Sequence, residues 1–283
     1  MLMTSNNGAL VQFYKDGFFG YGEKGDFRYF SIAHIIPLLL LGLGIFLFFR
    51  FREKLRNWKH EENFRFAFAF LMLFFEMSYF WRLVYVGSSE PGVVKDLLDK
   101  LPLQVCQWTC IFASFMIMKK SHNLFNVCFY VCLTMGIFPL ITPAVITTTG
   151  PTYYRYYQYW GEHILPVLSV FYMMFVHGFK PTKKKMLLGI AFMSVLMVAA
   201  LICNANIPDA NYLYLTTEGT ANQGGSPMDL ITGIHIVPRV ILLAAVCIGL
   251  FFAAYYIHYA ITKKFGKKSE SKPSNEEAEA VKQ

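Results

Sequence analysis

The stretch YFSIAHIIPLLLLGLGIFLFFRFREKLR, residues 29–56, decides the fold, because a long apolar run ends abruptly in a cluster of cations. The run from Tyr29 to Phe49 is long enough to cross a hydrocarbon core of about 30 Å as a helix, which takes roughly 20 residues. Arginine and lysine side chains follow it at positions 50, 52, 54 and 56. Because cations beside a span stay on the cytoplasmic side, this segment indicates a helix that enters the membrane from outside.

Six further apolar runs share this length and composition. In the whole chain of 283 residues, 55% are hydrophobic and only 16% are charged, which leaves too little polar surface for an ordinary soluble domain. Runs of this length and uniformity are helices rather than barrel strands. We therefore expect an all-α polytopic membrane protein with seven transmembrane helices, at Tyr29–Phe49, Phe64–Val86, Leu101–Met118, Leu124–Val145, His163–Phe179, Met186–Cys203 and Val240–Ile261.

The distribution of charge orients these spans. Most of the 26 Lys and Arg residues occupy the gaps after the first, third and fifth runs and the tail after the seventh. The long connection from Asn204 to Thr232 contains none. By the positive-inside rule, the N-terminus lies outside and the C-terminus is cytoplasmic. The net charge of +8 is thus a topology signal, and no nucleic-acid partner is expected.

Three regions follow from composition. Residues 1–28 alternate glycine, aromatic and charged residues, which suits an interfacial lead-in. Residues 29–261 form one seven-helix membrane domain. Residues 262–283 carry basic and acidic side chains without helical apolar periodicity and are expected to be a disordered cytoplasmic tail. The aromatic segment TYYRYYQYW, Thr152–Trp160, is interpreted as a loop in the interfacial belt before the fifth span.

Polar residues among apolar helices are costly and therefore mark function. Glu76 and Arg82 lie on the second span about 9 Å apart in height at 1.5 Å per residue, as a structural pair or a headgroup contact. Other polar groups share the outer half of the membrane or its outer connections, and they suggest a cleft open to the outer leaflet. They are His34, Gln104, Cys106, Gln107, His163, Asn211 and Asp229. Asn211 and Asp229 are loop caps or headgroup ligands.

The six cysteines do not predict a metal site. Cys106 and Cys110 lie near the outer end of their span and Cys128 near the cytoplasmic end of the next, so a four-thiolate cluster is not expected, and neither a metal nor another cofactor is predicted. Cys106 stands apart because it follows Pro102 at a helix start, where the helix dipole favours thiolate. His163 lies at matching depth. A nucleophile and a base are the minimum for covalent acyl transfer, although His163 alone could be an interfacial hydrogen-bonding group.

Short segments distributed through the chain resemble the transmembrane protein 164 acyltransferase family and its bacterial YwaF-type relatives. They are FSIAHI at 30–35, LPLQVC at 101–106, GIFPLITP at 136–143, YQYWGEHILP at 157–166, NYLYL at 211–215 and SPMDL at 226–230. The resemblance implies an enzyme that moves fatty acyl groups between lipids. It assigns the nucleophile to Cys106 and the histidine of the fifth span to His163. Gln104 stands where the family pattern has histidine, and glutamine cannot transfer a proton near neutral pH.

The sequence thus predicts a cysteine-dependent acyltransferase that remodels membrane lipids. Cys106 and His163 would be catalytic, with Gln104, Gln107, Glu76, Arg82, His34, Asn211 and Asp229 binding or supporting the substrate. Its partners would be phospholipids or lysolipids, and its place a cell membrane, by resemblance a bacterial cytoplasmic one. The alternative is a non-catalytic transporter or a lipid or peptide receptor that uses the same outer cleft.

Overall fold

The computed structural model describes residues 18–19, 27–87, 101–143, 150–207, 210–215 and 234–270, with side chains excluded at 80–87 and 265–270. Within these ranges every regular element is a helix and no strand occurs, which confirms the all-α prediction for them. The elements are α2 (Ile32–Arg50), α3 (Arg52–Arg56), α4 (Glu61–Gly87), α6 (Val105–Lys119), α7 (His122–Cys132), η1 (Met135–Ile137), α8 (Phe138–Ile141), α9 (Tyr154–Phe175), α10 (Met186–Asn206), η3 (Tyr212–Tyr214) and α11 (Ile236–Glu270).

Three of the described helices are long and apolar enough to cross a membrane, namely α2, α10 and the part of α11 from Ile236 to Lys264. Helix α7 and the η1–α8 segment, bent by 51° at the break between them, together count as a fourth. In an 18-residue apolar stretch of each helix, only 11% of the residues of α2, 22% of those of α10 and 11% of those of α11 are buried inside the protein. Large apolar side chains such as Leu39, Val195 and Ile241 are therefore exposed, as expected where lipid is the solvent.

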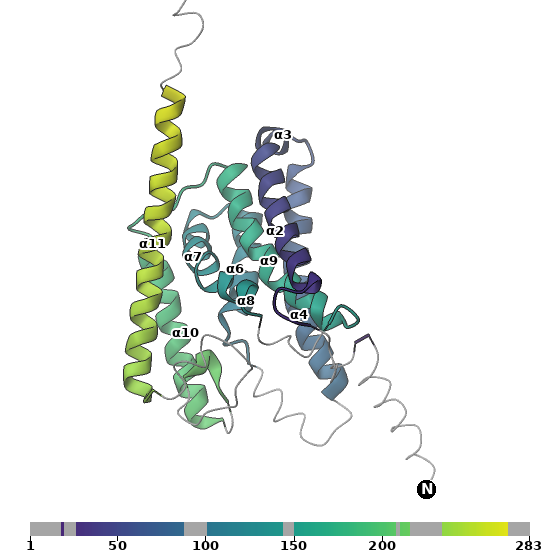
Figure 1. Ribbon diagram of the computed structural model, residues 1–283, viewed down its shortest axis with the longest axis vertical. Helices are drawn as coiled ribbons and strands as arrows, with labels where there is room; N and C mark the ends of the chain where they lie inside the picture. Colours follow the sequence, from purple (N-terminus) through teal and green to yellow (C-terminus); the bar gives the residue numbers. More distant parts are fainter. Residues whose placement is uncertain are drawn as a thin grey trace, which may run out of the picture.

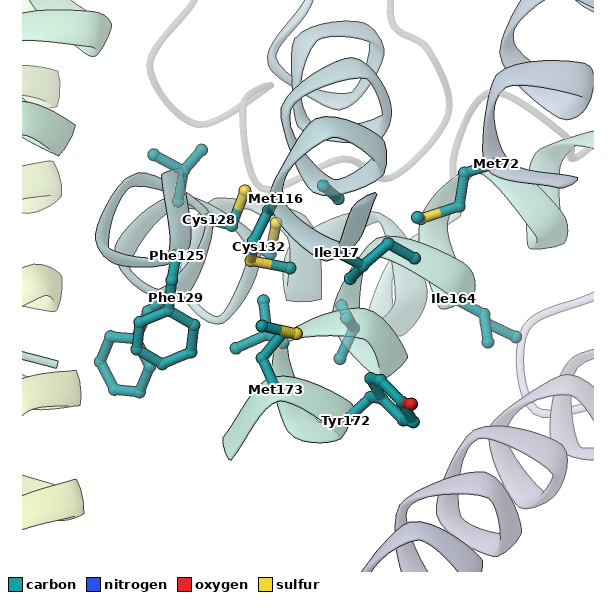
Figure 2. Packing of buried hydrophobic residues seen from close by; sticks show 14 of the residues in the cluster. Met72, Met116, Ile117, Phe125, Cys128, Phe129, Cys132, Ile164, Tyr172 and Met173 are labelled. Atoms are coloured by element: carbon teal, nitrogen blue, oxygen red, sulfur yellow. The ribbon is translucent and has the colours of Figure 1, made fainter. Parts of the chain in front are cut away.

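Helix α9 is the centre of the bundle and packs against α2, α4, α6 and α7 (Figure 1). Most of its residues are buried, and these are mainly apolar or aromatic with a few polar side chains among them. Figure 2 shows the resulting core, in which Met116 of α6, Cys128 and Phe129 of α7, and Tyr172 and Met173 of α9 lie together. Because α9 contacts each of these neighbours, it is the element that can bring their side chains to one site.

Helices α10 and α11 form the opposite edge of the molecule (Figure 1). They pack against α7, where Phe251 of α11 lies 5.5 Å, centroid to centroid, from Tyr130. The segment at η3 joins this edge to the start of α6: Asn204 binds the backbone of Tyr212 through both side-chain atoms, and the Tyr212 hydroxyl accepts a hydrogen bond from the Leu101 N–H at 2.7 Å. Tyr212 therefore positions the chain that leads into α6.

The interpretation of Thr152–Trp160 as a loop is wrong, because α9 begins at Tyr154 and includes most of this segment. Some of its aromatic side chains pack in the core and others face the surface. Tyr156, Tyr159 and Trp160 are buried, whereas Tyr157 is exposed. Since Tyr and Trp combine a large apolar body with a hydrogen-bonding tip, the same composition suits an interfacial belt and a buried helix face. Composition alone could not separate the two.

The fourth predicted run, Leu124–Val145, is interrupted rather than continuous. Helix α7 ends at Cys132, and Pro139 in the following segment has no N–H to donate and disfavours a regular helix. The Tyr159 hydroxyl donates to the Pro139 carbonyl at 2.7 Å, and Nε2 of His34 donates to the Leu140 carbonyl at 2.9 Å. Side chains from α9 and α2 thus satisfy carbonyls at the break.

The start of α6 and the end of α11 also differ from the sequence prediction. Helix α6 begins at Val105 rather than Leu101, because Gln107 accepts a hydrogen bond from the backbone N–H of Gln104 and caps the helix there. Helix α11 continues through Glu270, nine residues past the predicted end of the domain at Ile261, so the start of the expected disordered tail is helical. The remainder of the tail, and most of the predicted lead-in 1–28, lie outside the described residues.

A buried charge cluster joins α4, α6 and α9 at the end of the bundle where α4 begins. Glu61 accepts hydrogen bonds from Arg65 at 2.8 Å, from Tyr172 at 2.6 Å and from His177 at 2.8 Å. Arg65 also donates to the carbonyl oxygens of Ile117 and Met118 at the end of α6. We call Glu61, Arg65, Tyr172 and His177 the Glu61 cluster. Because its charges are compensated, the cluster stabilises this junction of three helices.

Replacing Glu61 by Gln is expected to lower the free energy of unfolding by about 3 kcal/mol, because it leaves the buried Arg65 guanidinium without its carboxylate. The measurement is equilibrium unfolding of the purified protein in mixed detergent micelles. Glu62→Gln is the matched control, since the side chain of Glu62 is 72% exposed and its loss should change the stability by less than about 0.5 kcal/mol. Equal stability of the two variants would contradict the assigned role.

The wild type and the Glu61→Gln variant also allow a test by the pH dependence of stability. Glu61 lies before the apolar run that starts at Phe64; burial alone would raise its pKa, but hydrogen bonds from Tyr172, Arg65 and His177 lower that pKa from 4.5 to about 2. A lowered folded-state pKa stabilises the protein above pH 4.5, and that stabilisation is lost as the pH falls from 4.5 toward 2. The stability difference between wild type and Glu61→Gln should therefore shrink over this interval, and a constant difference would refute it.

Candidate functional site

Cys106 is the second residue of α6, in the first turn of the helix. The four N–H groups at a helix start have no intrahelical partner and carry the positive end of the helix dipole, so they present hydrogen-bond donors beside Cys106. The residue is partly exposed, whereas Cys110, one turn further, is buried and donates its thiol to the Glu162 carbonyl at 3.1 Å. Of these two thiols, Cys106 is the one open to a reactant.

His163 lies in the middle of α9 and is buried. Its Nδ1 lies 2.7 Å from the carbonyl oxygen of Tyr159, one turn earlier, and the two rings pack with centroids 4.2 Å apart. A carbonyl can only accept a hydrogen bond, so Nδ1 carries the proton and neutral His163 has its lone pair on Nε2. The Tyr159 carbonyl thus fixes the tautomer in which Nε2 can accept a proton.

The structure brings Cys106, Glu162 and His163 together. One sulfur, one carboxylate oxygen and one ring nitrogen from these residues all lie within 4.8 Å of one another. We call these three residues the Cys106 site. Two of them come from α9 and one from α6, so the site exists only where the two helices pack.

Glu162 is held by two other residues on the same face of α9. Gln158 donates from Nε2 to Glu162 Oε2 at 2.7 Å and to the carbonyl of Phe75 on α4 at 3.0 Å. The guanidinium of Arg155 lies 3.6 Å from the same carboxylate oxygen and hydrogen-bonds Gln158. It also lies over the ring of Tyr79 at 4.5 Å. The spacing 155, 158, 162 places the three side chains on one helix face.

Glu76 of α4 is the second carboxyl group near this site. It is 2% exposed, and neither of its oxygens has a hydrogen-bond partner among the described residues. It is close enough to interact electrostatically with Cys106, Glu162 and Arg155. A buried carboxyl group without a partner is costly, and its position beside three ionisable groups points to a role in the site rather than in packing.

Close packing of α4 against α9 sets the distance between these groups. Gly161 lies next to Glu162, and a Cβ atom built on it would lie 2.6 Å from the Phe75 ring of α4. Phe75 precedes Glu76 in the chain, so glycine at 161 allows the two carboxyl-bearing helices to approach. Any larger residue would move them apart.

The predicted supporting residues divide into several groups. Gln107 is buried and caps α6 at Gln104, and His34 uses both ring nitrogens on backbone groups, accepting from the Phe30 N–H and donating to the Leu140 carbonyl. The side chains of Gln107 and His34 therefore form hydrogen bonds with backbone groups. Asn211 precedes η3 and is partly buried. Arg82 lies on α4 with its side chain outside the described residues, as is the whole of Asp229.

The sequence interpretation missed Glu162, Arg155, Gln158 and Tyr159. The available signal was the helical spacing of Arg155, Gln158 and Glu162 together with the i, i+4 pair Tyr159 and His163. Treating the aromatic segment as a loop removed that periodicity, because helical spacing is informative only within a helix. The predicted column of Glu76 and Arg82 likewise gave no hint that Glu76 faces α9.

Comparison with known proteins adds a family to this geometry. A model described as the TMEM164 family matches residues 29–264, which covers α2 through most of α11. The chain belongs to the TMEM164 family. It is a multi-pass membrane protein with apolar helices, and the suspected family is confirmed, whereas the relation to YwaF-type proteins stays a prediction. Comparisons with curated proteins and with solved structures find no match.

Chemically, this family member presents a partly exposed thiol, a neutral imidazole with a free Nε2 and two buried carboxyl groups near one guanidinium. The thiol and imidazole suit nucleophilic acyl transfer. The thiol, imidazole and carboxylates are also the donor types that bind Zn²⁺. Both uses draw on the same atoms.

Replacing Gly161 by Ala is expected to destabilise the protein by about 1–3 kcal/mol, because the added methyl overlaps the Phe75 ring and forces α4 from α9. Thermal unfolding in detergent measures the change as a lower Tm. Gly249→Ala on α11 is the matched control: its Cβ would meet nothing within 4 Å, and a helical Gly→Ala change gains about 0.5–1 kcal/mol. A Tm for Gly161→Ala equal to that of Gly249→Ala would show that this close approach is unimportant.

Proposed function

We propose that this protein is a cysteine-dependent acyltransferase that moves fatty acyl groups between membrane lipids. The observation that supports it most directly is the Cys106 site, in which a helix-start thiol lies within 4.8 Å of a ring nitrogen of a histidine whose tautomer leaves Nε2 free. A nucleophile beside a base that is itself oriented by a third group is the common arrangement for covalent acyl transfer. Here the orienting group is the Tyr159 carbonyl.

The proposed reaction has two halves. Nε2 of His163 takes the thiol proton while the Cys106 sulfur attacks the acyl carbonyl of a donor lipid. The sulfur–carbon bond forms, the ester carbon–oxygen bond breaks, and His163 returns the proton to the leaving alkoxide. The hydroxyl of an acceptor lysolipid then attacks the thioester, giving its proton to His163, which passes it to the released thiolate.

The negative charge that develops on the acyl oxygen needs hydrogen-bond donors. The first-turn N–H groups of α6 have no intrahelical partners and point out of the helix start beside Cys106. The side-chain amide of Gln104, the N-terminal cap of α6, is a further donor. Gln104 replaces the histidine of the family pattern, and in this mechanism it donates a hydrogen bond while His163 handles the proton.

We further propose seven membrane passes, with the N-terminus outside, the C-terminus in the cytoplasm and the Cys106 site open to the outer leaflet. The cation distribution and the order of the described helices support this arrangement. Phospholipids and lysolipids would then reach Cys106 from the outer leaflet. The proposed location is a cell membrane, specifically a bacterial cytoplasmic membrane.

Two hydrogen bonds at the broken span favour acyl transfer over transport. Unwound backbone in transporters exposes carbonyls to the transported species. Here the carbonyls of Pro139 and Leu140 instead accept hydrogen bonds from Tyr159 and His34. Receptor function without catalysis would not require the histidine tautomer that the Tyr159 carbonyl selects.

The decisive measurement is acyl transfer from a labelled phospholipid to a lysolipid by the purified protein in vesicles. Cys106→Ala is expected to abolish both transfer and the hydroxylamine-sensitive thioester on the protein, whereas His163→Gln should slow transfer by roughly 10²–10⁴-fold. Cys203→Ala, on α10, is the control and should retain wild-type activity. Full activity in Cys106→Ala would refute the nucleophile, and a wild type without transfer or thioester would refute the function.

A further inference from the structure

We propose that the Cys106 site together with Glu76 binds a zinc ion, and that the bound ion blocks acyl transfer. The metal binding stands on the geometry of three side chains, whereas its effect on acyl transfer rests on the proposed function. Cys106, Glu162 and His163 supply a sulfur, an oxygen and a nitrogen that all lie within 4.8 Å of one another. Glu76 lies outside this group of three but interacts electrostatically with Cys106 and Glu162, and it is buried without a hydrogen-bond partner among the described residues; we propose it as the fourth ligand.

The spacing suits a small tetrahedral ion. With Zn–S of about 2.3 Å and Zn–N and Zn–O of about 2.0–2.2 Å, two ligand atoms on a tetrahedral zinc are roughly 3.3–3.7 Å apart. Atoms that already lie within 4.8 Å of one another need to approach by at most about 1.5 Å to reach that geometry. An approach of this size is within the range of side-chain rotation.

The histidine already has the form that a metal requires. Ligating histidines donate one ring N–H to a carbonyl or carboxylate, which orients the ring and frees the other nitrogen for the ion. Nδ1 of His163 makes this bond to the Tyr159 carbonyl, so Nε2 is the ligand. The Glu162 carboxylate is oriented in a similar way by Gln158.

Charge balance supports the same proposal. In the metal-bound state, with Cys106, Glu162 and Glu76 deprotonated, these groups carry three negative charges, and Arg155, 3.6 Å from Glu162, supplies one positive charge beside them. A divalent cation makes the group neutral, which is the least costly state in an apolar environment. It also gives the buried Glu76 carboxylate the partner it lacks. The mixture of thiolate, imidazole and carboxylate favours Zn²⁺ over Mg²⁺ or Ca²⁺, which prefer all-oxygen sites.

Binding replaces the thiol proton with the metal, and that proton passes to the solvent without oxidation or reduction. The ion is then bound by the Cys106 sulfur and by Nε2 of His163 at the same time. Acyl transfer needs the sulfur as nucleophile and Nε2 as base, so zinc and an acyl group cannot share the site. Zinc would thus keep the enzyme inactive until it is removed.

The test uses Cd²⁺, whose bond to a thiolate gives an ultraviolet charge-transfer band, on the full chain purified in detergent, reduced and stripped of metal. We expect one Cd²⁺ per chain, no band in Cys106→Ser and an unchanged band in the control Cys203→Ser. His163→Gln and Glu162→Gln should each weaken binding by at least about 10-fold, and Glu76→Gln should weaken it to a smaller extent. A band that persists in Cys106→Ser, or an affinity unchanged in both His163→Gln and Glu162→Gln, overturns the proposal.

A second measurement needs no variant and therefore does not depend on how the variants fold. Zn²⁺, but not Mg²⁺, should protect Cys106 of the wild type from alkylation by a maleimide, as read by mass spectrometry of its peptide. Equal labelling with and without Zn²⁺ overturns the site. Neither readout depends on acyl transfer. Binding of Cd²⁺ at Cys106 without any thioester would contradict only the proposed function. Formation of a thioester without metal binding would contradict only the zinc site.

Discussion

The hydrogen bond from Nδ1 of His163 to the carbonyl of Tyr159 is the interaction on which the site depends. It joins residues one turn apart on α9, and it uses a carbonyl that a helix can share with a side chain. Its effect is chemical as well as structural, because it places the only proton of neutral His163 on Nδ1. The free Nε2 and the thiol of Cys106 then have complementary roles, whether the occupant is an acyl group or a metal ion.

The tyrosines of α9 also hold their positions in the bundle through hydrogen bonds to other elements. A polar tip buried among apolar helices needs a partner, and each of three tyrosines finds one on a different element. Tyr154 binds Ser78 of α4, Tyr156 binds the Ala33 carbonyl of α2, and Tyr159 binds the Pro139 carbonyl of α8. The aromatic segment therefore fixes the position of α9 against its neighbours, and with it the position of Glu162 and His163.

The two ends of the bundle treat buried carboxyl groups in opposite ways. Glu61 has Arg65, Tyr172 and His177 as hydrogen-bond donors, and its charge is compensated. Glu76 has no such donor among the described residues, and Glu162, within the Cys106 site, has Gln158 and Arg155 on one of its two oxygens. A satisfied cluster stabilises the helix junction, whereas incomplete satisfaction leaves a group free to interact with a ligand. This contrast separates the structural end from the end where we place function.

The sequence by itself determined that the chain is helical and membrane-embedded, that it belongs to the family its motifs suggested, and that Cys106 lies at the start of a helix. Long apolar runs, cations at their ends and a proline near the start of the third run are local signals, and local signals suffice for these conclusions. Only the tertiary structure decided that α9 begins at Tyr154, that Glu162 joins Cys106 and His163, and that Glu76 faces them from α4. The physical reason is that an aromatic segment is equally suited to a membrane interface and to a helix core. Which face of α9 each side chain occupies relative to the bundle depends on how α9 is rotated about its axis. That rotation depends on which neighbouring helices supply hydrogen-bond partners for the polar groups of the aromatic segment.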